Sequence, residues 1–233
     1  MAAKRKINVS SKRKLESVIF DMDNTILDLN VDWKKLTEEI DTEYFDGKYS
    51  HLTPHKFFVA FFSRLLKKLT FKQQNEIRQK RLEKEITGIA TGTCFPYRGV
   101  VSSLGKRYKL GVVSGNYRPT VLKALQRCGF KRYIKAVVTI DDVPASKPSP
   151  LPLLAVLKKL KADPSKSVYI GDHPDDIRAA KNAGMYSIGV LTYSRNYDSI
   201  RQVTPDFIIK NLFELEKTLE TLEKMMAGEG NKR

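Results

Sequence analysis

The chain has only two cysteines, Cys94 and Cys128, among its 233 residues. Two cysteines are too few for the disulfide framework that holds small secreted domains together, and this pair lacks the C-x-x-C spacing of a zinc or redox site. The shortage of cysteine therefore favours a reducing, intracellular environment.

Long apolar runs are also absent from the sequence. The longest uninterrupted run is Phe57–Phe62, which is far shorter than the ~20 residues that span a bilayer. No apolar segment of the kind found in signal peptides follows the basic start of the chain. We therefore expect a soluble, cytoplasmic protein without a membrane partner.

Acidic residues are few compared with basic ones. The sequence has 26 Asp and Glu and 42 Lys and Arg, which gives a formal net charge of +16. This charge raises the local concentration of anions, so on charge alone nucleic acid, acidic membranes and phosphorylated metabolites are all open as partners. Residues 1–16 start with a stretch rich in Lys and Arg that is typical of a disordered, solvated arm. A nuclear-localisation signal or a nucleic-acid contact is the alternative interpretation of this arm.

Four short apolar runs end directly in Asp, Ser, Gly or Pro residues: VIFDMDN (18–24), KLGVVSGN (109–116), KAVVTIDD (135–142) and SVYIGDHPDD (167–176). Nearly continuous apolar strands are typical of a parallel sheet that is covered on both faces. Helical periodicity near residues 121–128, 153–160 and 177–183 alternates with them, and Gly129 and Gly184 supply C-terminal helix signals. The pattern predicts a doubly wound α/β core.

Residues 31–94 interrupt this alternation with helical patterns alone. Helices are expected to begin at Trp33, at Pro54 and near Thr70, where Gln73 lies in capping-box register. We therefore predict an all-helical insertion at 31–94 after the first strand. The α/β core then comprises 17–30 and 95–225, and 226–233 form a flexible tail.

Four aspartates, Asp21, Asp23, Asp172 and Asp176, follow two of the predicted strands. The carboxyl ends of parallel strands meet at one edge of a sheet, so these side chains should converge there. Clustered carboxylates repel one another unless a hard cation offsets their charge, which points to Mg²⁺.

The first aspartates, Asp21 and Asp23, have two other interpretations. An EF-hand loop starting at Asp21 fails because Ile26 stands where glycine is needed and Asp32 where a bidentate Glu is needed. Simple turn hydrogen bonds by Asp21 and Asp23 are the second alternative.

The segment Asp21-Met-Asp23-Asn-Thr25 after an apolar strand resembles the D-x-D-x-T signature of the haloacid dehalogenase-like hydrolase superfamily. Ser114, Lys147 before Pro148, and the acidic segment Gly171–Asp176 follow in the order of that superfamily's other motifs. The resemblance spans roughly residues 17–215. It implies a Rossmann-like core with a small helical cap of the type-one class.

The resemblance also implies a role for each matching residue. Asp21 would be the nucleophile and Asp23 the general acid and base, whereas Ser114, Gly115, Asn116 and Lys147 would bind the substrate phosphate. Mg²⁺ would be held by Asp21, the main-chain carbonyl of Asp23, Asp172 and Asp176. Asp175 is expected to be a helix-start residue that reaches the metal shell. Aspartate at position 23 is typical of the family's phosphatases and phosphomutases.

Each accessory motif has a plainer interpretation when it is taken alone. Residues 114–116 can form an ordinary turn, Lys147 can be an exposed loop lysine, and Asp172 and Asp176 can complement a helix dipole. These motifs occur in the expected order at the ends of successive strands, which favours a common site for phosphate and metal over the separate plainer interpretations.

Two cap features remain less specific. His51 and His55 are four residues apart, but Pro54 lies between them and no third ligand is apparent, so cap-surface or substrate-facing roles are favoured over a metal site. A solvated helix face, or a surface that steers anionic substrates, is predicted for the cationic cap residues Arg64, Lys67, Lys68, Lys72, Arg78, Lys80, Arg81 and Lys84.

Together the residues and the resemblance imply a Mg²⁺-dependent phosphatase of small phosphomonoesters that works through an aspartyl-phosphate, and among the family's members the chain resembles phosphoglycolate phosphatase and beta-phosphoglucomutase. A phosphomutase of sugar phosphates is the nearest alternative. A basic nucleic-acid-binding protein on the same fold, including a phosphatase of nucleic-acid ends, is the other, and it requires binding that weakens steeply with salt.

Overall fold

A computed structural model describes residues 14–191 and 197–228 of the chain, without the side chains of residues 62 and 63. Residues 1–13 of the predicted basic arm, and with them the nuclear-localisation and nucleic-acid interpretations, lie outside the described residues. Leu15 is already buried in the core, and the backbone N–H of Glu16 donates to the carbonyl of Lys166 over 2.7 Å. The ordered core therefore starts two residues earlier than the pattern predicted.

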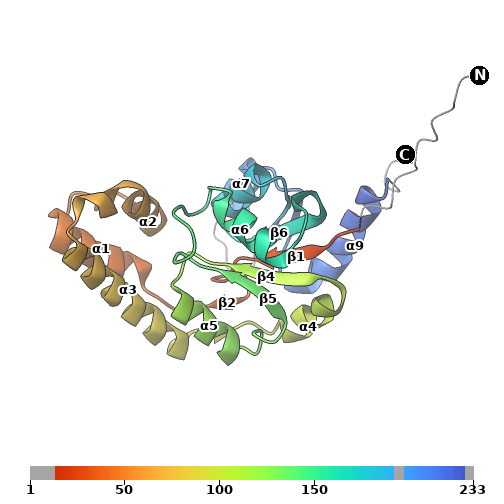
Figure 1. Cartoon of the computed structure of the whole chain (residues 1–233), viewed down its shortest axis with the longest axis horizontal. Coiled ribbons are helices and arrows are strands. Elements are labelled where there is room, and N and C mark those ends of the chain that lie inside the picture. The colour runs from red at the N-terminus through yellow and green to blue at the C-terminus, as the bar shows by residue number, and fades with distance from the viewer. Residues whose placement is uncertain (1–13, 192–196, 229–233) are drawn as a thin grey trace, which may run out of the picture.

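A six-stranded parallel sheet forms the centre of the molecule, with the strand order β5-β4-β1-β6-β7-β8 (Figure 1). The strands are β1 Ser17–Phe20, β4 Lys109–Val113, β5 Ile134–Val138, β6 Ser167–Gly171, β7 Tyr186–Val190 and β8 Phe207–Ile209. The helices that alternate with them are α4 Arg98–Arg107, α5 Arg118–Arg127, α6 Leu151–Leu160, α7 Pro174–Asn182, α8 Tyr197–Gln202 and α9 Leu215–Met226. The predicted doubly wound α/β fold is confirmed.

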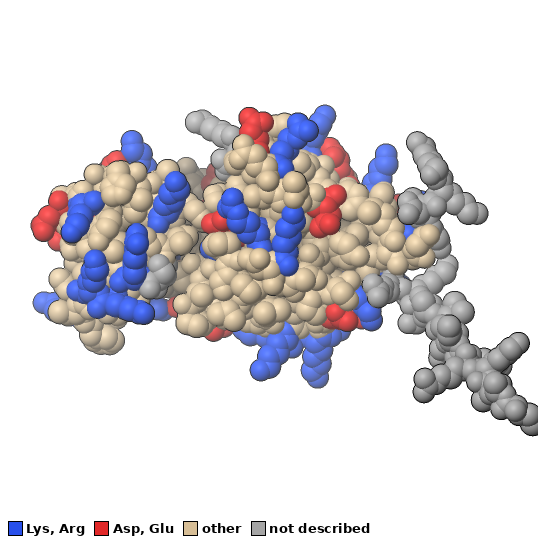
Figure 2. Space-filling view, turned by 90° about the horizontal axis from the view of Figure 1, so that it is seen from above, with Lys and Arg blue, Asp and Glu red and all other residues tan. Residues whose placement is uncertain are grey.

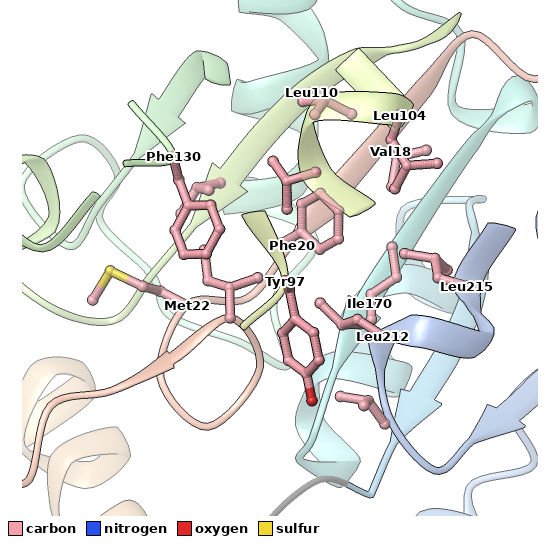
Figure 3. Packing of buried hydrophobic residues seen from close by; sticks show 14 of the residues in the cluster. Val18, Phe20, Met22, Tyr97, Leu104, Leu110, Phe130, Ile170, Leu212 and Leu215 are labelled. Carbon is pink, nitrogen blue, oxygen red and sulfur yellow. The ribbon is translucent and has the colours of Figure 1, made fainter. Parts of the chain in front are cut away.

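Helices cover both faces of the sheet because alternate strand residues point to opposite sides. Val18 and Phe20 of β1 pack with α4, α5 and α9, and Figure 3 shows this core around Phe20 and Leu104. Ile19 points to the other face, where Tyr169 and the helices α6 and α7 cover it. Both faces of β1 are therefore buried, as its uninterrupted apolar run predicted.

The cap consists of α1 Trp33–Phe45, α2 Pro54–Ala60 and α3 Phe71–Thr91, with α2 continuing through short helical turns at Phe61–Leu65 and Leu66–Lys68. The predicted capping box is present, because the backbone N–H of Gln73 donates to Thr70 and the Gln73 side chain accepts from the Thr70 N–H. Leu36, Phe57 and Ile77 give these helices an apolar core of their own. A short antiparallel pair, β2 Leu27–Asp28 with β3 Thr93–Cys94, closes the base of the insertion.

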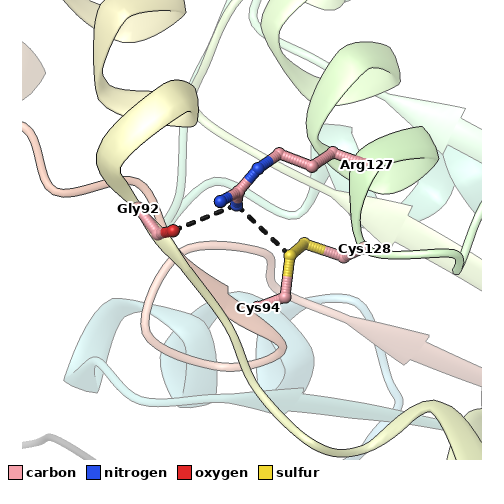
Figure 4. The surroundings of a disulfide bond; sticks show 4 residues. All are labelled: Gly92, Cys94, Arg127 and Cys128. Atoms are coloured by element: carbon pink, nitrogen blue, oxygen red, sulfur yellow. Dashed lines mark hydrogen bonds between the residues drawn. A yellow bond between two sulfur atoms is a disulfide. The ribbon is translucent and has the colours of Figure 1, made fainter.

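Cys94 and Cys128 form a disulfide bond, with their Cα atoms 5.3 Å apart (Figure 4). The number and spacing of the cysteines did not predict this pairing, which arises because the fold brings β3 beside the C-terminal end of α5 across 34 residues of sequence. Arg127 Nη1 supports the junction by donating to the carbonyl of Gly92 over 3.0 Å. A crosslink of this kind typically stabilises a fold by about 2–4 kcal/mol. It also removes the cysteine-based reason for a reducing environment.

Among the described residues, no helix is both long and apolar enough to cross a bilayer.

Candidate active site

A cavity of about 610 Å³ lies between the cap and the carboxyl ends of the strands. Every residue that the sequence predicted for the site lines it: Asp21, Asp23, Ser114, Gly115, Asn116, Lys147, Asp172 and Asp176. The fold therefore brings into one cavity residues that are more than a hundred positions apart.

The register of the sheet explains this convergence. Phe20, the last residue of β1, pairs with Val112 of β4 on one side and with Ile170 of β6 on the other. Asp21 follows directly, and its backbone N–H still donates to the carbonyl of Ile170 over 2.8 Å. Ser114 and Asp172 leave the neighbouring strands at the same edge, as expected for a parallel sheet.

Asp21, Asp172 and Asp176 form an acidic cluster in which each offers a carboxylate oxygen within 4.8 Å of the others. Gly171 makes room for it, because a Cβ atom there would lie 2.3 Å from Asp176 Oδ2. Burial raises the pKa of Asp172 well above its ordinary value, and the charges of Asp21 and Asp176 add to this effect. Burial likewise raises the pKa of Asp21 to about 7, although Lys147 opposes the shift.

Lys147 lies between two of these carboxylates. Its Nζ donates to Asp21 Oδ1 over 2.6 Å, to Asp176 Oδ1 over 2.5 Å and to the Tyr169 hydroxyl over 3.1 Å. The ammonium stays charged, because the carboxylates raise its pKa well above the ordinary value even though burial acts the other way. The exposed-loop interpretation of Lys147 was therefore wrong.

The acidic cluster fits a hard divalent cation. Three buried or half-buried carboxylates face one lysine, so negative charge is in excess, and the donor set consists of oxygen alone. Mg²⁺ and Mn²⁺ are typical of such sets. The segment after Asp21 is not an EF-hand loop, because a strand, β1, precedes it instead of a helix.

Asp23 is half-buried and lines the cavity. Its Oδ1 accepts the backbone N–H of Leu29 over 2.9 Å, and its carboxylate is also hydrogen-bonded to the Trp33 side chain. Burial raises the pKa of Asp23 to about 6 against these hydrogen bonds. A carboxyl group with such a pKa can both give and take a proton near neutral pH.

Residues 114–116 form a turn that also lines the cavity. Ser114 Oγ accepts the backbone N–H of Asn116 over 3.2 Å. The space beside Gly115 is open, with no atom within 4 Å of where a Cβ would stand. The bend places the Ser114 side chain and the Gly115 backbone at the cavity, and the phosphate-binding role of these residues stays a prediction.

Arg81 is a cavity residue that the sequence pattern misplaced. It is 4% exposed, so the prediction of a solvated cationic face does not hold for it. Its Nη2 donates to the carbonyl of Gly115 over 2.7 Å, and its guanidinium lies 4.5 Å from the ring centre of Phe58. The helical spacing of Arg81 from buried Ile77 was the signal that could have located it.

Glu85, one turn after Arg81, joins the cap to the core. It is fully buried; its Oε1 accepts from Arg81 Nε over 2.7 Å, and its Oε2 accepts the Thr120 hydroxyl over 2.7 Å and the Tyr117 backbone N–H over 3.1 Å. Tyr117 and Thr120 belong to the start of α5. The pair Arg81 and Glu85 therefore links cap helix α3 to the turn that carries Ser114.

Asp175 is not part of the acidic cluster, contrary to the expectation that it reaches the metal shell. Its Oδ2 is 2.7 Å from His55 Nε2, and its Oδ1 accepts from Arg178 Nη1 over 2.7 Å. Burial alone would raise the pKa of Asp175, but these hydrogen bonds outweigh it and lower the pKa to about 2. Burial lowers the pKa of neighbouring His173 to about 4.

With this geometry established, comparison with known proteins decides the family. A family model described as haloacid dehalogenase-like hydrolase matches residues 18–190. The chain belongs to the haloacid dehalogenase-like hydrolase family. The expected family, the α/β fold and the enzyme class, a hydrolase, are thereby confirmed. The roles of the individual site residues stay predictions.

Two bacterial proteins illustrate the similarity of the chain to known enzymes. A pyrophosphatase PpaX from Bacillus pumilus (strain SAFR-032) is 28% identical over 210 residues, which cover 86% of this chain and 94% of that protein. A phosphoglycolate phosphatase from Escherichia coli (strain K12) is 33% identical over 148 residues, which cover 61% of this chain and 58% of that protein. These bacterial relatives give nuclear localisation no support.

Two solved structures illustrate the shared fold. A hydrolase from Pseudomonas syringae matches with a TM-score of 0.69 at 19% identity, covering 89% of this chain and 99% of that chain. An HAD phosphatase from Thermococcus onnurineus matches with a TM-score of 0.61 at 24% identity, and the match covers 88% of this chain and 98% of that chain. At these identities the likeness concerns the fold.

Proposed function

We propose that this haloacid dehalogenase-like hydrolase is a Mg²⁺-dependent phosphatase of small phosphomonoesters that forms an aspartyl-phosphate at Asp21. The observation that carries the proposal is the acidic cluster of Asp21, Asp172 and Asp176 with Lys147 inserted between its members. An anionic carboxylate can attack an anionic phosphoryl group only where positive charge screens the repulsion. Lys147 supplies part of that charge, and Mg²⁺ bound by the cluster and the main-chain carbonyl of Asp23 would supply the rest.

In the first step, a carboxylate oxygen of Asp21 bonds to phosphorus while the bond from phosphorus to the ester oxygen breaks. The leaving oxygen takes a proton from Asp23. In the second step, water bonds to phosphorus, passes a proton to Asp23, and releases inorganic phosphate by breaking the bond to Asp21. Division into two displacements lowers the barrier of each. Ser114 and the turn after it would orient the phosphoryl oxygens.

The proton transfer by Asp23 predicts a specific pH dependence. With saturating Mg²⁺, whose charge would keep Asp21 ionised, log(kcat/KM) for an alkyl phosphate is expected to fall above about pH 6, because the first step needs protonated Asp23 and its pKa is raised to about 6. With 4-nitrophenyl phosphate, whose phenolate leaves without help from an acid, the fall should vanish. Steady-state phosphate release between pH 4.5 and 9 measures both profiles.

Asp23→Asn is the matched control for that profile. It should lower the rate for the alkyl ester by about 10²–10⁴-fold and remove the pH-dependent fall. If the pH profile of Asp23→Asn were the same as that of the wild type, or if both esters showed the same fall, a group other than Asp23 would be responsible for the titration.

The proposed substrate is small because the cap covers the cavity. Lys and Arg side chains are spread over both the cap and the core on the face seen in Figure 2, which suits steering of anionic substrates. Phosphoglycolate is the leading candidate. Pyrophosphate, which is a phosphoanhydride and not a monoester, is a second candidate, because the relative that covers 86% of this chain is a pyrophosphatase.

A phosphate-release screen tests the proposal. The full chain is stripped of metal with a chelator and assayed on phosphoglycolate, sugar phosphates, nucleotides and pyrophosphate, with and without Mg²⁺. Release that requires Mg²⁺ is expected on at least one small phosphate compound. If none of these compounds releases phosphate in the presence of Mg²⁺, the proposal is refuted.

The same screen separates the alternatives. Conversion of one sugar phosphate into another without free phosphate would identify a phosphomutase. A nucleic-acid-binding role remains a prediction from the net charge, and a salt titration of binding by the full chain is its check.

A further inference from the structure

A second group of metal-ligating side chains lies at the rim of the cavity, apart from the acidic cluster. His55, His173 and Asp175 each offer one ligand atom, and these atoms lie within 4.8 Å of one another. His55 Nε2 is 2.7 Å from Asp175 Oδ2, and the two imidazole rings have centres 4.0 Å apart. The sequence suggested His51 as the second possible metal ligand beside His55. The fold instead places two core residues, His173 and Asp175, next to His55.

The donor set of this group differs from that of the acidic cluster. Two imidazoles and one carboxylate are typical ligands of Zn²⁺, Co²⁺, Ni²⁺ and Cu²⁺, and three protein ligands leave a fourth position for water. The oxygen donors of Asp21, Asp172 and Asp176 suit Mg²⁺ instead. The two neighbouring sites should therefore select different ions.

Local contacts already orient the three ligands. Arg178 holds Asp175 Oδ1 over 2.7 Å, which leaves Oδ2 facing His55. Nδ1 of His173 accepts the backbone N–H of Asp175 over 3.2 Å, so this nitrogen carries a lone pair, which a bound ion would take over from that N–H. The His55 side chain is 42% exposed, so an ion can reach the group from solvent.

The ligands come from opposite sides of the cavity. His55 belongs to cap helix α2, whereas His173 and Asp175 belong to the start of core helix α7. In Figure 1, α2 and α7 lie on the upper side of the molecule, whereas α3 and α5 lie on the lower side. The buried contacts of Glu85 join α3 to α5, so a bridge between α2 and α7 would close the other side.

We propose that His55, His173 and Asp175 form a second metal site, selective for Zn²⁺ and similar ions over Mg²⁺, that bridges the cap and the core and holds the cavity closed. An ion that binds the closed arrangement better than an open one shifts the population toward closure. Because substrate and product must pass the cap, such an ion slows turnover. The binding claim itself does not depend on the identity of the phosphorylated substrate.

Co²⁺ and Zn²⁺ binding to the full chain, with Mg²⁺ in large excess, tests the site directly. We expect one Zn²⁺ per chain by calorimetry and visible Co²⁺ absorption bands typical of imidazole ligands. His55→Ala should weaken Zn²⁺ binding by at least about tenfold. His51→Ala removes an exposed histidine from the same cap and is the matched control, with unchanged affinity expected.

Closure has its own measurement. Zn²⁺ is expected to slow hydrogen exchange of the α2 amides in the wild type and in His51→Ala, but not in His55→Ala. Asp175→Asn provides a second variant that should weaken Zn²⁺ binding. Equal Zn²⁺ affinity of His55→Ala and the wild type would overturn the proposal, as would displacement of the Zn²⁺ by Mg²⁺ with loss of the Co²⁺ bands, because the ion would then occupy the acidic cluster.

Discussion

Asp21→Asn is expected to abolish phosphate release, with a loss on the order of 10⁴-fold or more in kcat, as found when a covalent nucleophile is removed. The amide has no anionic oxygen to bond to phosphorus, so the aspartyl-phosphate cannot form. Quenching the wild type in acid during turnover with ³²P-labelled substrate should trap label on the protein, whereas the variant should carry none.

The fold should survive this change. The folded-state pKa of Asp21 is about 7, above its ordinary value of 3.8, so in metal-free buffer its ionisation destabilises the protein as pH rises through that window. A neutral amide removes this penalty. The melting temperature of Asp21→Asn at pH 8 without metal should therefore not fall below that of the wild type.

Asp198→Asn is the control for charge removal, because Asp198 is exposed on α8. It should keep wild-type kinetics. If Asp21→Asn retained wild-type turnover on every substrate, or if labelled protein still formed, another residue would have to be the nucleophile.

The sequence was sufficient for the part of the site that depends on the sheet. Asp21, Ser114 and Asp172 each follow an apolar run, and parallel strands that leave the sheet at one edge have to bring them together. Neither the exact register nor any cap contact was needed for that inference. Local signals also located the helix starts at Trp33 and Pro54.

Contacts between the cap and the core were beyond that reasoning. The meeting of His55 with Asp175 depends on how α2 packs against α1 and α3, and periodicity does not specify the angle at which helices pack. The pairing of Cys94 with Cys128 was missed for a similar reason, because their proximity arises from a short strand and a helix end. The charge of Arg81 favours exposure, whereas its helical spacing from buried Ile77 indicates the burial that the structure shows.

Tyr169 shows a different limit. Its position inside an apolar strand predicts burial, which the structure confirms. The contact between its hydroxyl and Lys147 Nζ, at 3.1 Å, depends on the course of the loop that carries Lys147. A buried tyrosine hydroxyl usually has a hydrogen-bond partner, but sequence alone does not identify it.

Glu85→Ala is expected to lower the free energy of unfolding by about 3–5 kcal/mol, the cost typical of breaking a buried ion pair from one side. The Arg81 guanidinium, with 5% of its side chain exposed, would lose its carboxylate partner. The Thr120 hydroxyl and the Tyr117 N–H would lose their acceptor as well. Urea unfolding of the metal-free protein measures the loss.

Glu83→Ala is the matched control, because Glu83 is exposed on the same helix and undergoes the same chemical change. It should alter the free energy of unfolding by no more than about 0.5 kcal/mol. A loss in Glu85→Ala no larger than that of Glu83→Ala would mean that the buried network contributes little to stability.

The double variant Arg81→Met with Glu85→Leu separates the charge from the packing. Replacing both members of a buried ion pair by apolar residues of similar size is often neutral, because the desolvation cost of both charges disappears with their attraction. The double variant should therefore be more stable than Glu85→Ala. Arg81 also holds the carbonyl of Gly115, so the double variant should still lose turnover through a displaced Ser114 turn. Recovered stability with reduced kcat would show that the pair serves to align the cap with the catalytic turn, whereas recovery of both would limit its role to folding.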